Sequence, residues 1–235
     1  MGATRFPGKM LAKIKGKSVI RRTYESTVNT GLFNQVVVVT DSDEIIAEIN
    51  ACGGVAVKSK AAFESGTDRI AEVVKDLEGD IFVNVQGDEP FVQKQPLASL
   101  LNLFENDENV QVASLVQVLQ DEEFIKDPNF VKVALDRNNN ALFFSRSIIP
   151  YPRNKDISIP YYEHIGVYAF KKEALMNFTS WPATALESAE KIECLRFLEY
   201  GIPIKMALTN YMGVEIDTPE DIIRAEQLME SNGWV

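Results

Sequence analysis

Residues 35–58, QVVVVTDSDEIIAEINACGGVAVK, decide the fold class. Residues 35–40 are apolar and β-branched without alternation, which predicts a strand buried on both faces. Residues 42–52 place their isoleucines on one helical face, and Gly53 follows them as a helix stop. Residues 55–58 form another short β-branched run. A strand, a helix and a strand in this order predict a βαβ unit.

The same alternation of apolar runs and helical periods continues along the chain. It predicts helices at residues 67–77, 95–104, 186–200 and 219–230, and strands at 80–85, 110–118, 131–135, 141–144, 164–170 and 202–208. Residues 150–162 are rich in Pro, Tyr and charge, which predicts a mobile loop over the edge of the sheet. The fold class that follows is α/β, with a mixed, mostly parallel sheet flanked by helices. We predict a single domain over residues 1–235, with an inserted lobe at roughly 120–200.

The composition excludes several classes of protein. Lys and Arg number 24 against 34 Asp and Glu, and the formal charge of −10 disfavours binding to nucleic acid or to an anionic membrane surface. No apolar stretch approaches the ~20 residues that cross a bilayer, and the first residues lack a signal sequence. The only cysteines, Cys52 and Cys194, form no CxxC pair, which fits a reducing cytoplasm.

Two aspartates are candidates for a magnesium site. Asp88 follows the predicted strand at 80–85 in a glycine-containing turn, where open α/β sheets bind ligands. Thr218 and Asp221 form a helix cap that leaves the preceding Asp217, at the end of a predicted strand, without a structural explanation. Carboxylates are ligands that Mg²⁺ prefers. We expect Asp88 and Asp217 to share one ion, the alternative for Asp88 being a turn-forming role.

Basic residues near the start of the chain suit phosphate oxygens. Arg5 and Lys9 stand among glycines in the stretch GATRFPGK. The stretch is not a Walker A loop, because Met10 stands where Ser or Thr would bind magnesium. A solvated basic turn is the alternative interpretation.

Three further positions carry functional hypotheses. Arg69 lies in the first turn of a predicted helix, where a cation opposes the helix dipole, so a bound anion or base would explain it. Arg146 follows an apolar strand and is placed to grip a carboxylate, with a surface ion pair as the alternative. His164 is the only histidine, and a core or surface position competes with a catalytic one.

Taken together, the motifs resemble the 3-deoxy-manno-octulosonate cytidylyltransferases, also called CMP-KDO synthetases. The stretches that carry the resemblance run nearly end to end: TRFPGK, VVVVTD, SGTDR, NVQGDEP, VKVALD, ALFFSRSIIP, HIGVYAF, ECLR and DTPED. The resemblance implies a Rossmann-like nucleotidyltransferase fold and a homodimer formed through the inserted lobe. It also implies that CMP passes from CTP to 3-deoxy-D-manno-octulosonate (KDO), for lipopolysaccharide biosynthesis, with release of pyrophosphate.

The resemblance also implies roles for individual residues. Arg5 and Lys9 correspond to triphosphate ligands, and Asp88 and Asp217 correspond to Mg²⁺ ligands. The implied nucleotide contacts are Ser65, Gly66, Arg69 and Gln86, and the implied sugar contacts are Arg146, His164, Tyr168 and Glu193.

Two departures from the family pattern bear on these expectations. The family begins with an apolar strand and a Pro-Ala-Arg turn, whereas this sequence starts at Met1-Gly2. We therefore expect Met1 to be an internal methionine of a chain roughly ten residues longer. Cys194 stands where many relatives have Gln, which leaves the exact acceptor open.

Other functions remain as alternatives. A cytidylyltransferase for 8-amino-KDO, sialic acid or another 2-keto sugar acid would share the motifs. A glycosyltransferase would use a paired acidic motif such as Asp41-Ser42-Asp43, although a helix cap explains these residues. A nucleotide-binding scaffold without activity is the third class.

Overall fold

The structure is a computed structural model that describes residues 6–60, 66–210 and 213–234. Contacts divide the chain into two compact units. The first comprises residues up to 76, 85–97 and 212 onward, and the second comprises 77–84 and 98–211. The lobe predicted at roughly 120–200 lies within the second unit. The prediction of one domain over the whole chain stays a prediction.

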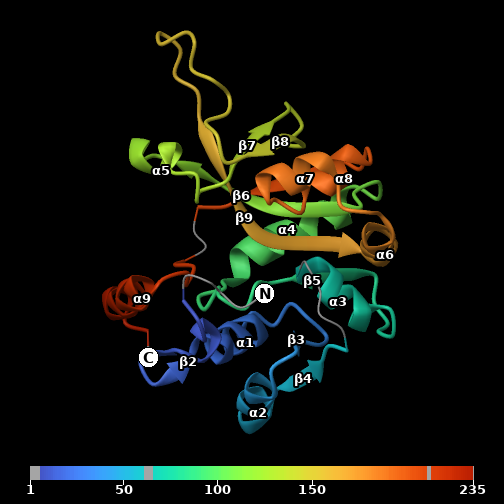
Figure 1. Cartoon of the computed structure of the whole chain (residues 1–235), viewed down its shortest axis with the longest axis vertical. Helices are drawn as coiled ribbons and strands as arrows, with labels where there is room; N and C mark the ends of the chain where they lie inside the picture. Colours follow the sequence, from blue (N-terminus) through green and yellow to red (C-terminus); the bar gives the residue numbers. More distant parts are fainter. Residues whose placement is uncertain (1–5, 61–65, 211–212, 235) are drawn as a thin grey trace. The chain divides into compact units, whose positions relative to one another are not determined.

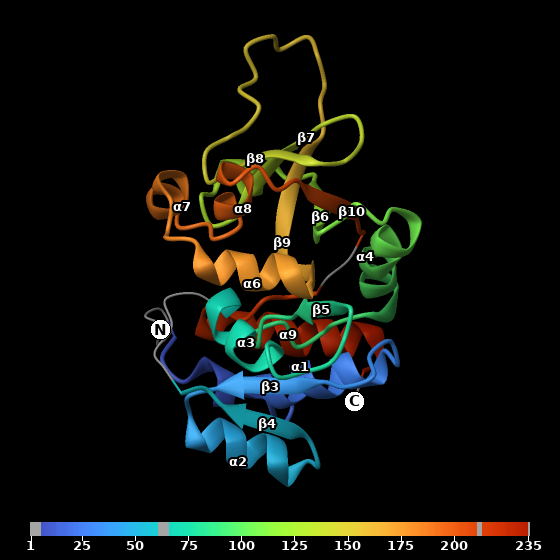
Figure 2. The same cartoon turned by 90° about the vertical axis from the view of Figure 1, so that its right-hand side faces the viewer.

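The first unit contains the predicted βαβ motif. The strands β3 (Val37–Thr40) and β4 (Val55–Lys58) pair in parallel, and α2 (Asp43–Ala51) connects them. Figure 2 shows the two strands side by side with α2 beside β4. The expectation that residues 35–40 are buried on both faces is wrong, since only Thr40 is buried. The described part of the chain gives β3 one partner strand, so less of its surface is covered.

The first unit also contains an apolar cluster apart from the βαβ motif. The remaining elements of this unit are η1 (Lys9–Leu11), β1 (Lys13–Ile14), β2 (Lys17–Ser18), α1 (Val19–Asn29), α3 (Gly66–Val74) and α9 (Pro219–Asn232). The cluster joins residues far apart in sequence, namely Ile14, Val19, Phe91, Ile216, Ala225 and Met229. Helix α1 was not predicted. Polar side chains such as those of Thr23 and Thr27 lie on its buried face and obscure the apolar period.

The second unit is built on a six-stranded sheet. Its strands are β5 (Ile81–Asn84), β6 (Val112–Leu119), β7 (Lys132–Leu135), β8 (Ala141–Ser145), β9 (Tyr161–Lys171) and β10 (Ile204–Leu208). The order is β10-β6-β9-β7-β8, with β5 also paired to β9. The mixed sheet is confirmed, but the mostly parallel arrangement is wrong. Only β10 and β6 pair in parallel, because the long strand β9 runs antiparallel to β5, β6 and β7.

The helices of the second unit differ from the prediction at three places, because two of them, at residues 122–126 and 172–180, were not predicted and one predicted helix is divided in two. They are α4 (Lys94–Asn106), which begins in the first unit, and α5 (Glu122–Lys126), α6 (Lys172–Ser180), α7 (Ala185–Glu190) and α8 (Leu195–Glu199). The single helix predicted at 186–200 is wrong, because Lys191 adopts a left-handed conformation (φ 55°) that ends α7 before α8 begins. Within the described ranges, no helix is long and apolar enough to cross a membrane.

Residues 146–160, which we call the arm, join β8 to β9 without helix or strand. Every residue from 150 to 160 is exposed, and Figure 1 shows the arm extending beyond the ends of β7 and β8. The predicted loop therefore exists, but it extends into solvent instead of lying over the sheet edge.

A buried ion pair connects α7 to α8. The guanidinium of Arg196 donates to both carboxylate oxygens of Glu187, at 2.7 and 2.5 Å, and lies 4.0 Å from the ring centre of Phe178. The Glu187 and Arg196 side chains are 11% and 7% exposed. Because water scarcely reaches these charges, each depends on the other for neutralisation.

The cap of α9 holds the chain just before that helix. One carboxylate oxygen of Asp221, Oδ2, accepts hydrogen bonds from the N–H groups of Asp217 (3.0 Å) and Thr218 (2.8 Å). Burial favours the neutral form of Asp221, but these hydrogen bonds outweigh it and lower the pKa of its carboxyl group. The predicted capping box is thereby confirmed.

We expect Glu187→Gln to lower the free energy of unfolding by about 3 kcal/mol, because it leaves the buried Arg196 charge without its counter-charge. The melting temperature should fall by roughly 6–12 °C, measured by circular dichroism. Glu122→Gln is the control, because Glu122 forms an exposed ion pair with Lys126 and should cost less than about 0.5 kcal/mol. Equal melting temperatures for the two variants would contradict the assignment.

We expect Asp221→Ala to lower the free energy of unfolding by about 1 kcal/mol at pH 7. The folded-state pKa lies below the unfolded value, so this stabilisation is complete above the unfolded pKa and is lost as the pH falls through the folded one. The difference from wild type should therefore shrink below about pH 4. Urea unfolding at several pH values measures it, with the exposed Glu220→Ala as control. A difference that does not change with pH would rule out the carboxylate charge as its source.

Candidate active site

The turn that carries Asp88 is fixed by close packing in the first unit. Thr23 donates a hydrogen bond from Oγ1 to the Gly87 carbonyl oxygen at 2.7 Å. A Cβ atom on Gly87 would lie 2.9 Å from Ile20 Cδ1 and 3.1 Å from Met10 Sδ, so the side chains of Ile20 and Met10 pack closely against the backbone of the turn. The backbone that presents Asp88 is therefore held from two sides.

The segment 213–217 lies against this turn. Ile216 donates its N–H to the Asp88 carbonyl oxygen at 3.0 Å. Gly213 has a φ of 99°, and a Cβ atom there would lie 2.9 Å from Phe91 Cβ. Residues 213–217 are assigned no strand, so the predicted strand ending at Asp217 is wrong. Contacts with the turn hold the segment, in place of a sheet ladder.

Three carboxylates meet at this point. Asp88, Glu215 and Asp217 each offer an oxygen atom within 4.8 Å of the other two. Asp88 is buried, Asp217 is half-buried and Glu215 is exposed. The structure thus brings together the two aspartates that the sequence analysis selected. The structure adds Glu215, which the sequence analysis missed. Its spacing of two residues from Asp217 could have revealed it, since alternate residues of an extended segment point to the same side.

Lys9 bridges the two aspartates. Its ammonium nitrogen lies 2.6 Å from Asp88 Oδ2 and 2.8 Å from Asp217 Oδ1. Burial disfavours its charge, but the neighbouring carboxylates outweigh this and raise the pKa of Lys9 above its usual value. Lys9 therefore stays charged, as its predicted role toward phosphate requires, and it reduces the repulsion between the two acids.

The donor set fits a hard divalent cation. Asp88 Oδ1 is buried and has no hydrogen-bond partner among the described residues. A buried carboxylate oxygen in this state is costly unless a cation or a donor completes its surroundings. The available ligands are all carboxylate oxygens, which Mg²⁺ prefers. Asp88, Asp217 and Glu215 are the residues that would hold such an ion.

The predicted nucleotide contacts are placed only in part. Arg5 and Ser65 lie outside the described residues. Gly66 and Arg69 lie in the first turns of α3, and Gln86 is an exposed residue of the Asp88 turn. The guanidinium of Arg69 lies 3.4 Å from the carboxylate of Asp41, so a side chain, rather than a bound anion alone, offsets its unfavourable place in the helix. Ser42, and not Asp41, caps α2.

The predicted sugar contacts belong to the second unit. His164 and Tyr168 lie on β9, with ring centres 5.2 Å apart, and Glu193 lies between α7 and α8. His164 Nε2 is 3.1 Å from the hydroxyl of Ser114. Desolvation lowers the pKa of His164 to about 3, so its ring is neutral at pH 7.

Tyr168, one of the predicted sugar contacts, and Cys194 are both buried. Burial raises the pKa of both the Tyr168 hydroxyl and the Cys194 thiol, and the two side chains lie close enough for each to influence the pKa of the other. Cys194 therefore stays a protonated thiol at neutral pH, in contact with a residue that the family pattern assigns to the sugar.

Arg146 has structural partners. It donates from Nε to the Glu190 carbonyl oxygen at 2.8 Å and from Nη1 to the Pro128 carbonyl oxygen at 2.9 Å. The guanidinium thus connects the end of β8 to α7 and to the turn before β7. It bonds to carbonyl oxygens and not to a carboxylate, so the structure shows neither the predicted carboxylate contact nor the alternative surface ion pair. A role toward the sugar stays a prediction.

Comparison with known proteins agrees with these observations. The sequence profile of the cytidylyltransferase family matches residues 1–208. The chain is 51% identical to the 3-deoxy-manno-octulosonate cytidylyltransferase of Flavobacterium johnsoniae, covering 97% of this chain and 94% of that protein. It is 52% identical to the enzyme of the same name from Christiangramia forsetii, covering 97% and 92%.

Solved structures agree in fold. A CMP:2-keto-3-deoxy-manno-octonic acid synthetase complexed with CTP superimposes with a TM-score of 0.92 and 35% identity, covering 98% of this chain and 95% of that one. A 4-diphosphocytidyl-2C-methyl-D-erythritol synthase from Anaerococcus prevotii has a TM-score of 0.64 at 16% identity, which shows a shared fold alone. Together with the motifs and the carboxylate cluster, these matches place the chain in the 3-deoxy-manno-octulosonate cytidylyltransferase family.

Proposed function

We infer that this protein transfers CMP from CTP to KDO and releases pyrophosphate. The observation that carries the inference is the cluster of Lys9, Asp88 and Asp217, in a chain that matches cytidylyltransferases of this name over nearly its whole length. In the reaction, the anomeric hydroxyl of KDO attacks the α-phosphorus of CTP in line. A new P–O bond forms to the sugar, the bond to the β-phosphate oxygen breaks, and the hydroxyl proton is lost. No covalent enzyme intermediate is needed.

We propose Mg²⁺ as the ion held by Asp88, Asp217 and Glu215. When bound, it supplies charge neutralisation for the phosphate oxygens. The buried Asp88 Oδ1, which lacks a partner among the described atoms, supports this proposal. The carboxylates of Asp88 and Asp217 set the position of the bound cation, and the hydrogen bond to Asp221 orients the backbone of Asp217. Lys9 contributes a second fixed positive charge for the triphosphate.

We propose that Arg5, Ser65, Gly66, Arg69 and Gln86 contact the nucleotide and that Arg146, His164, Tyr168 and Glu193 contact the sugar. The lowered pKa of His164 supports a hydrogen-bonding role for its neutral ring at pH 7. The two free cysteines fit an enzyme of the reducing cytoplasm.

The alternative acceptor is 8-amino-KDO or another 2-keto sugar acid. The interaction between Cys194 and Tyr168 supports this alternative, because the family resemblance implies Gln at the position of Cys194. Pyrophosphate release from CTP with each acid in turn separates these acceptors. It also excludes a glycosyltransferase, which forms no pyrophosphate from CTP and a free sugar acid.

We expect Asp88→Asn and Asp217→Asn each to lower turnover by on the order of 10²-fold or more, because each removes a charge placed for the transition state. The assay measures pyrophosphate release from CTP and KDO. Both variants should also bind Mn²⁺ more weakly in electron paramagnetic resonance titrations, and the exposed Glu215→Gln should do so to a smaller extent. Asp43→Asn is the control, because Asp43 is exposed and pairs with Lys58. Near-full activity in both aspartate variants would remove the basis of the metal assignment.

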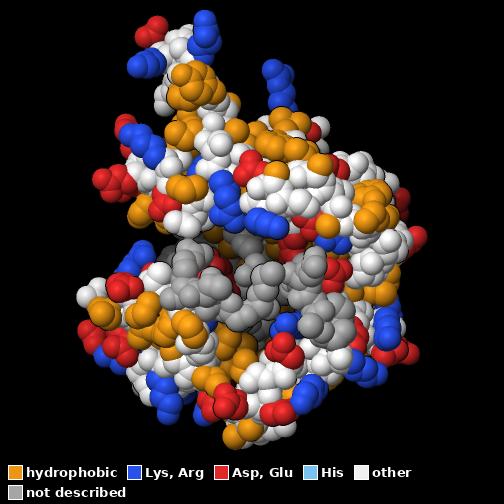
Figure 3. Space-filling model, viewed as in Figure 1, with side chains coloured by type: hydrophobic (Ala, Val, Ile, Leu, Met, Phe, Trp, Pro, Cys, Tyr) orange, Lys and Arg blue, Asp and Glu red, His pale blue; other side chains and the backbone are white. Residues whose placement is uncertain are grey.

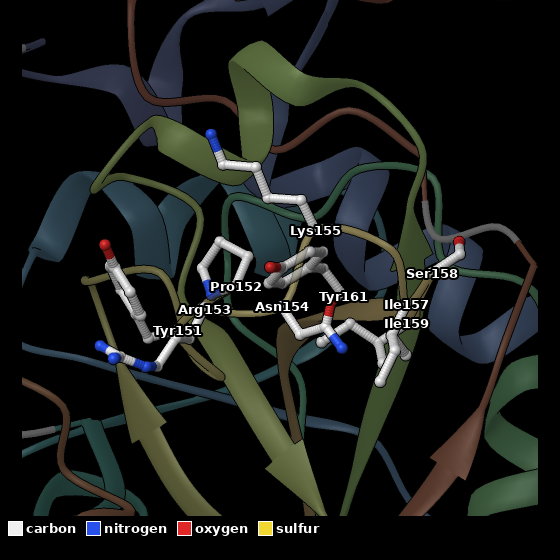
Figure 4. Close-up of a pocket in the computed structure, with 9 residues that line it drawn as sticks. All are labelled: Tyr151, Pro152, Arg153, Asn154, Lys155, Ile157, Ser158, Ile159 and Tyr161. Carbon is white, nitrogen blue, oxygen red and sulfur yellow. The ribbon is translucent and has the colours of Figure 1, made fainter.

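We propose that the protein is a homodimer formed through the lobe that carries the arm. Tyr151 and Ile157 are 80% and 61% exposed, although such side chains are usually covered. Side chains from both limbs of the arm line a hollow of about 420 Å³, as Figure 4 shows. Figure 3 shows hydrophobic, basic and acidic side chains together on the arm at the top of the view. A second copy of the chain would cover this apolar surface.

We expect the double variant Tyr151→Ser with Ile157→Ser to shift the protein from dimer to monomer, because it removes the exposed apolar side chains of the arm. Light scattering coupled to size exclusion measures the mass. Ile223→Ser is the matched control, since Ile223 is 60% exposed on α9. A wild-type mass equal to one chain, or a dimer that persists in the double variant, would count against this interface.

A further inference from the structure

A second cavity lies within the first unit, separate from the carboxylate cluster. Its volume is about 570 Å³, within the range of small-molecule sites. Side chains from α1, from residues 90–95 and from the end of α9 line it. None of the three clustered carboxylates is among its lining residues.

The cavity is cationic in a strongly acidic chain. Lys17, Arg22 and Lys94 line it against one acid, Glu25. Glu25 is already paired with Lys17 at 2.7 Å and with Arg21 at 2.7 Å. Glu25 acts on Arg22 only from beyond contact distance, and Lys94 forms no ion pair with it. In a protein with a net charge of −10, such a site attracts anions locally although the whole molecule repels them.

Arg22 is the most unusual of these residues. It is only 8% exposed, and its guanidinium donates to the carbonyl oxygens of Ile14 (Nε, 2.8 Å) and Lys15 (Nη2, 3.4 Å). Among the described residues, no carboxylate oxygen lies within 4.0 Å of the guanidinium nitrogens, and Nη1 donates no hydrogen bond. Burial lowers the pKa of Arg22. Glu25 and Glu226 favour its charge from a distance, but burial outweighs them, and an anion in direct contact with the guanidinium would offset the cost of burial.

Helix α4 adds a second source of positive charge. Its first residue, Lys94, is exposed and forms no ion pair within the described part of the chain, and Gln93 and Gln95 line the cavity beside it. The first N–H groups of a helix have no acceptor in their own helix and favour anions. The buried Arg22 and this helix start therefore converge on one cavity from different elements.

Aromatic rings form an apolar wall on another part of the cavity. Phe91 and Trp234 line the cavity with ring centres 5.5 Å apart and planes inclined at 42°. Met229 lies beside them. Such a wall suits a flat ring, because aromatic groups pack face to edge or offset against each other.

We propose that this cavity is a binding site for a small molecule that joins an oxyanion group, phosphate or carboxylate, to a flat ring. The oxyanion lies at Arg22 and the start of α4, and the ring packs against Phe91 and Trp234. The site is independent of the transfer reaction.

The experiment uses the intrinsic fluorescence of Trp234. The chain has 2 tryptophans, so Trp181→Phe leaves Trp234 as the only reporter. This protein is titrated with phenyl phosphate, benzoate and inorganic phosphate in the presence of saturating CTP, which occupies the nucleotide site. We expect phenyl phosphate or benzoate to change the Trp234 emission, and the one that binds identifies the oxyanion. The ring-bearing ligand should bind about tenfold more tightly than inorganic phosphate, since the ring buries apolar surface.

Variants locate the site. Lys94→Met, at an exposed position, should weaken binding about fivefold to tenfold, and Arg22→Met should weaken it further. Lys13→Met is the charge-matched control, because Lys13 is exposed and does not line the cavity. Circular dichroism checks that Arg22→Met folds, and Lys94→Met provides the test if it does not. An unchanged emission with both ring-bearing probes, equal affinity for phosphate and phenyl phosphate, or undiminished binding in Lys94→Met would each overturn the proposal.

Discussion

The ammonium group of Lys9, held between the carboxylates of Asp88 and Asp217, is the interaction on which the candidate site depends. Two acids at this distance repel each other, and in a partly buried setting the repulsion is screened weakly. The chain opposes it with a fixed cation and with backbone constraints. The hydrogen bond from Ile216 to Asp88 and the close approach of Gly213 to Phe91 hold the two segments together. The same constraints leave Asp88 Oδ1 buried and ready for a ligand.

The second unit satisfies its buried polar groups by different means. Arg196 is neutralised by Glu187, whereas the fully buried Lys132 donates to the carbonyl oxygens of Asp127 and Phe130. His164 is kept neutral against aromatic rings and Ser114. The first two contacts fix the junction of α7 with α8 and the turn before β7, and the third lies within β9. Shape and hydrogen bonding, more than charge, therefore distinguish this part of the protein.

Patterns of neighbouring residues predicted the features that depend on neighbouring residues, such as short strands and helix caps. The strand at Val55–Lys58 has the predicted bounds, and the capping box of α9 was read from residues three positions apart. The antiparallel course of β9 and the break at Lys191 were missed, because partner strands and the Glu187–Arg196 pair decide them. Arg69 was understood only in part, since Asp41, which offsets its charge, lies 28 residues away.

The sequence by itself determined the α/β class, the family and the choice of Asp88 and Asp217, because periodicity, capping and motif order are written in neighbouring residues. Only the tertiary structure decided that Lys9 bridges these acids, that Glu215 joins them, and that Arg22 and Trp234 line one cavity. Distances between side chains far apart in sequence depend on how the whole unit packs. No local pattern specifies that packing.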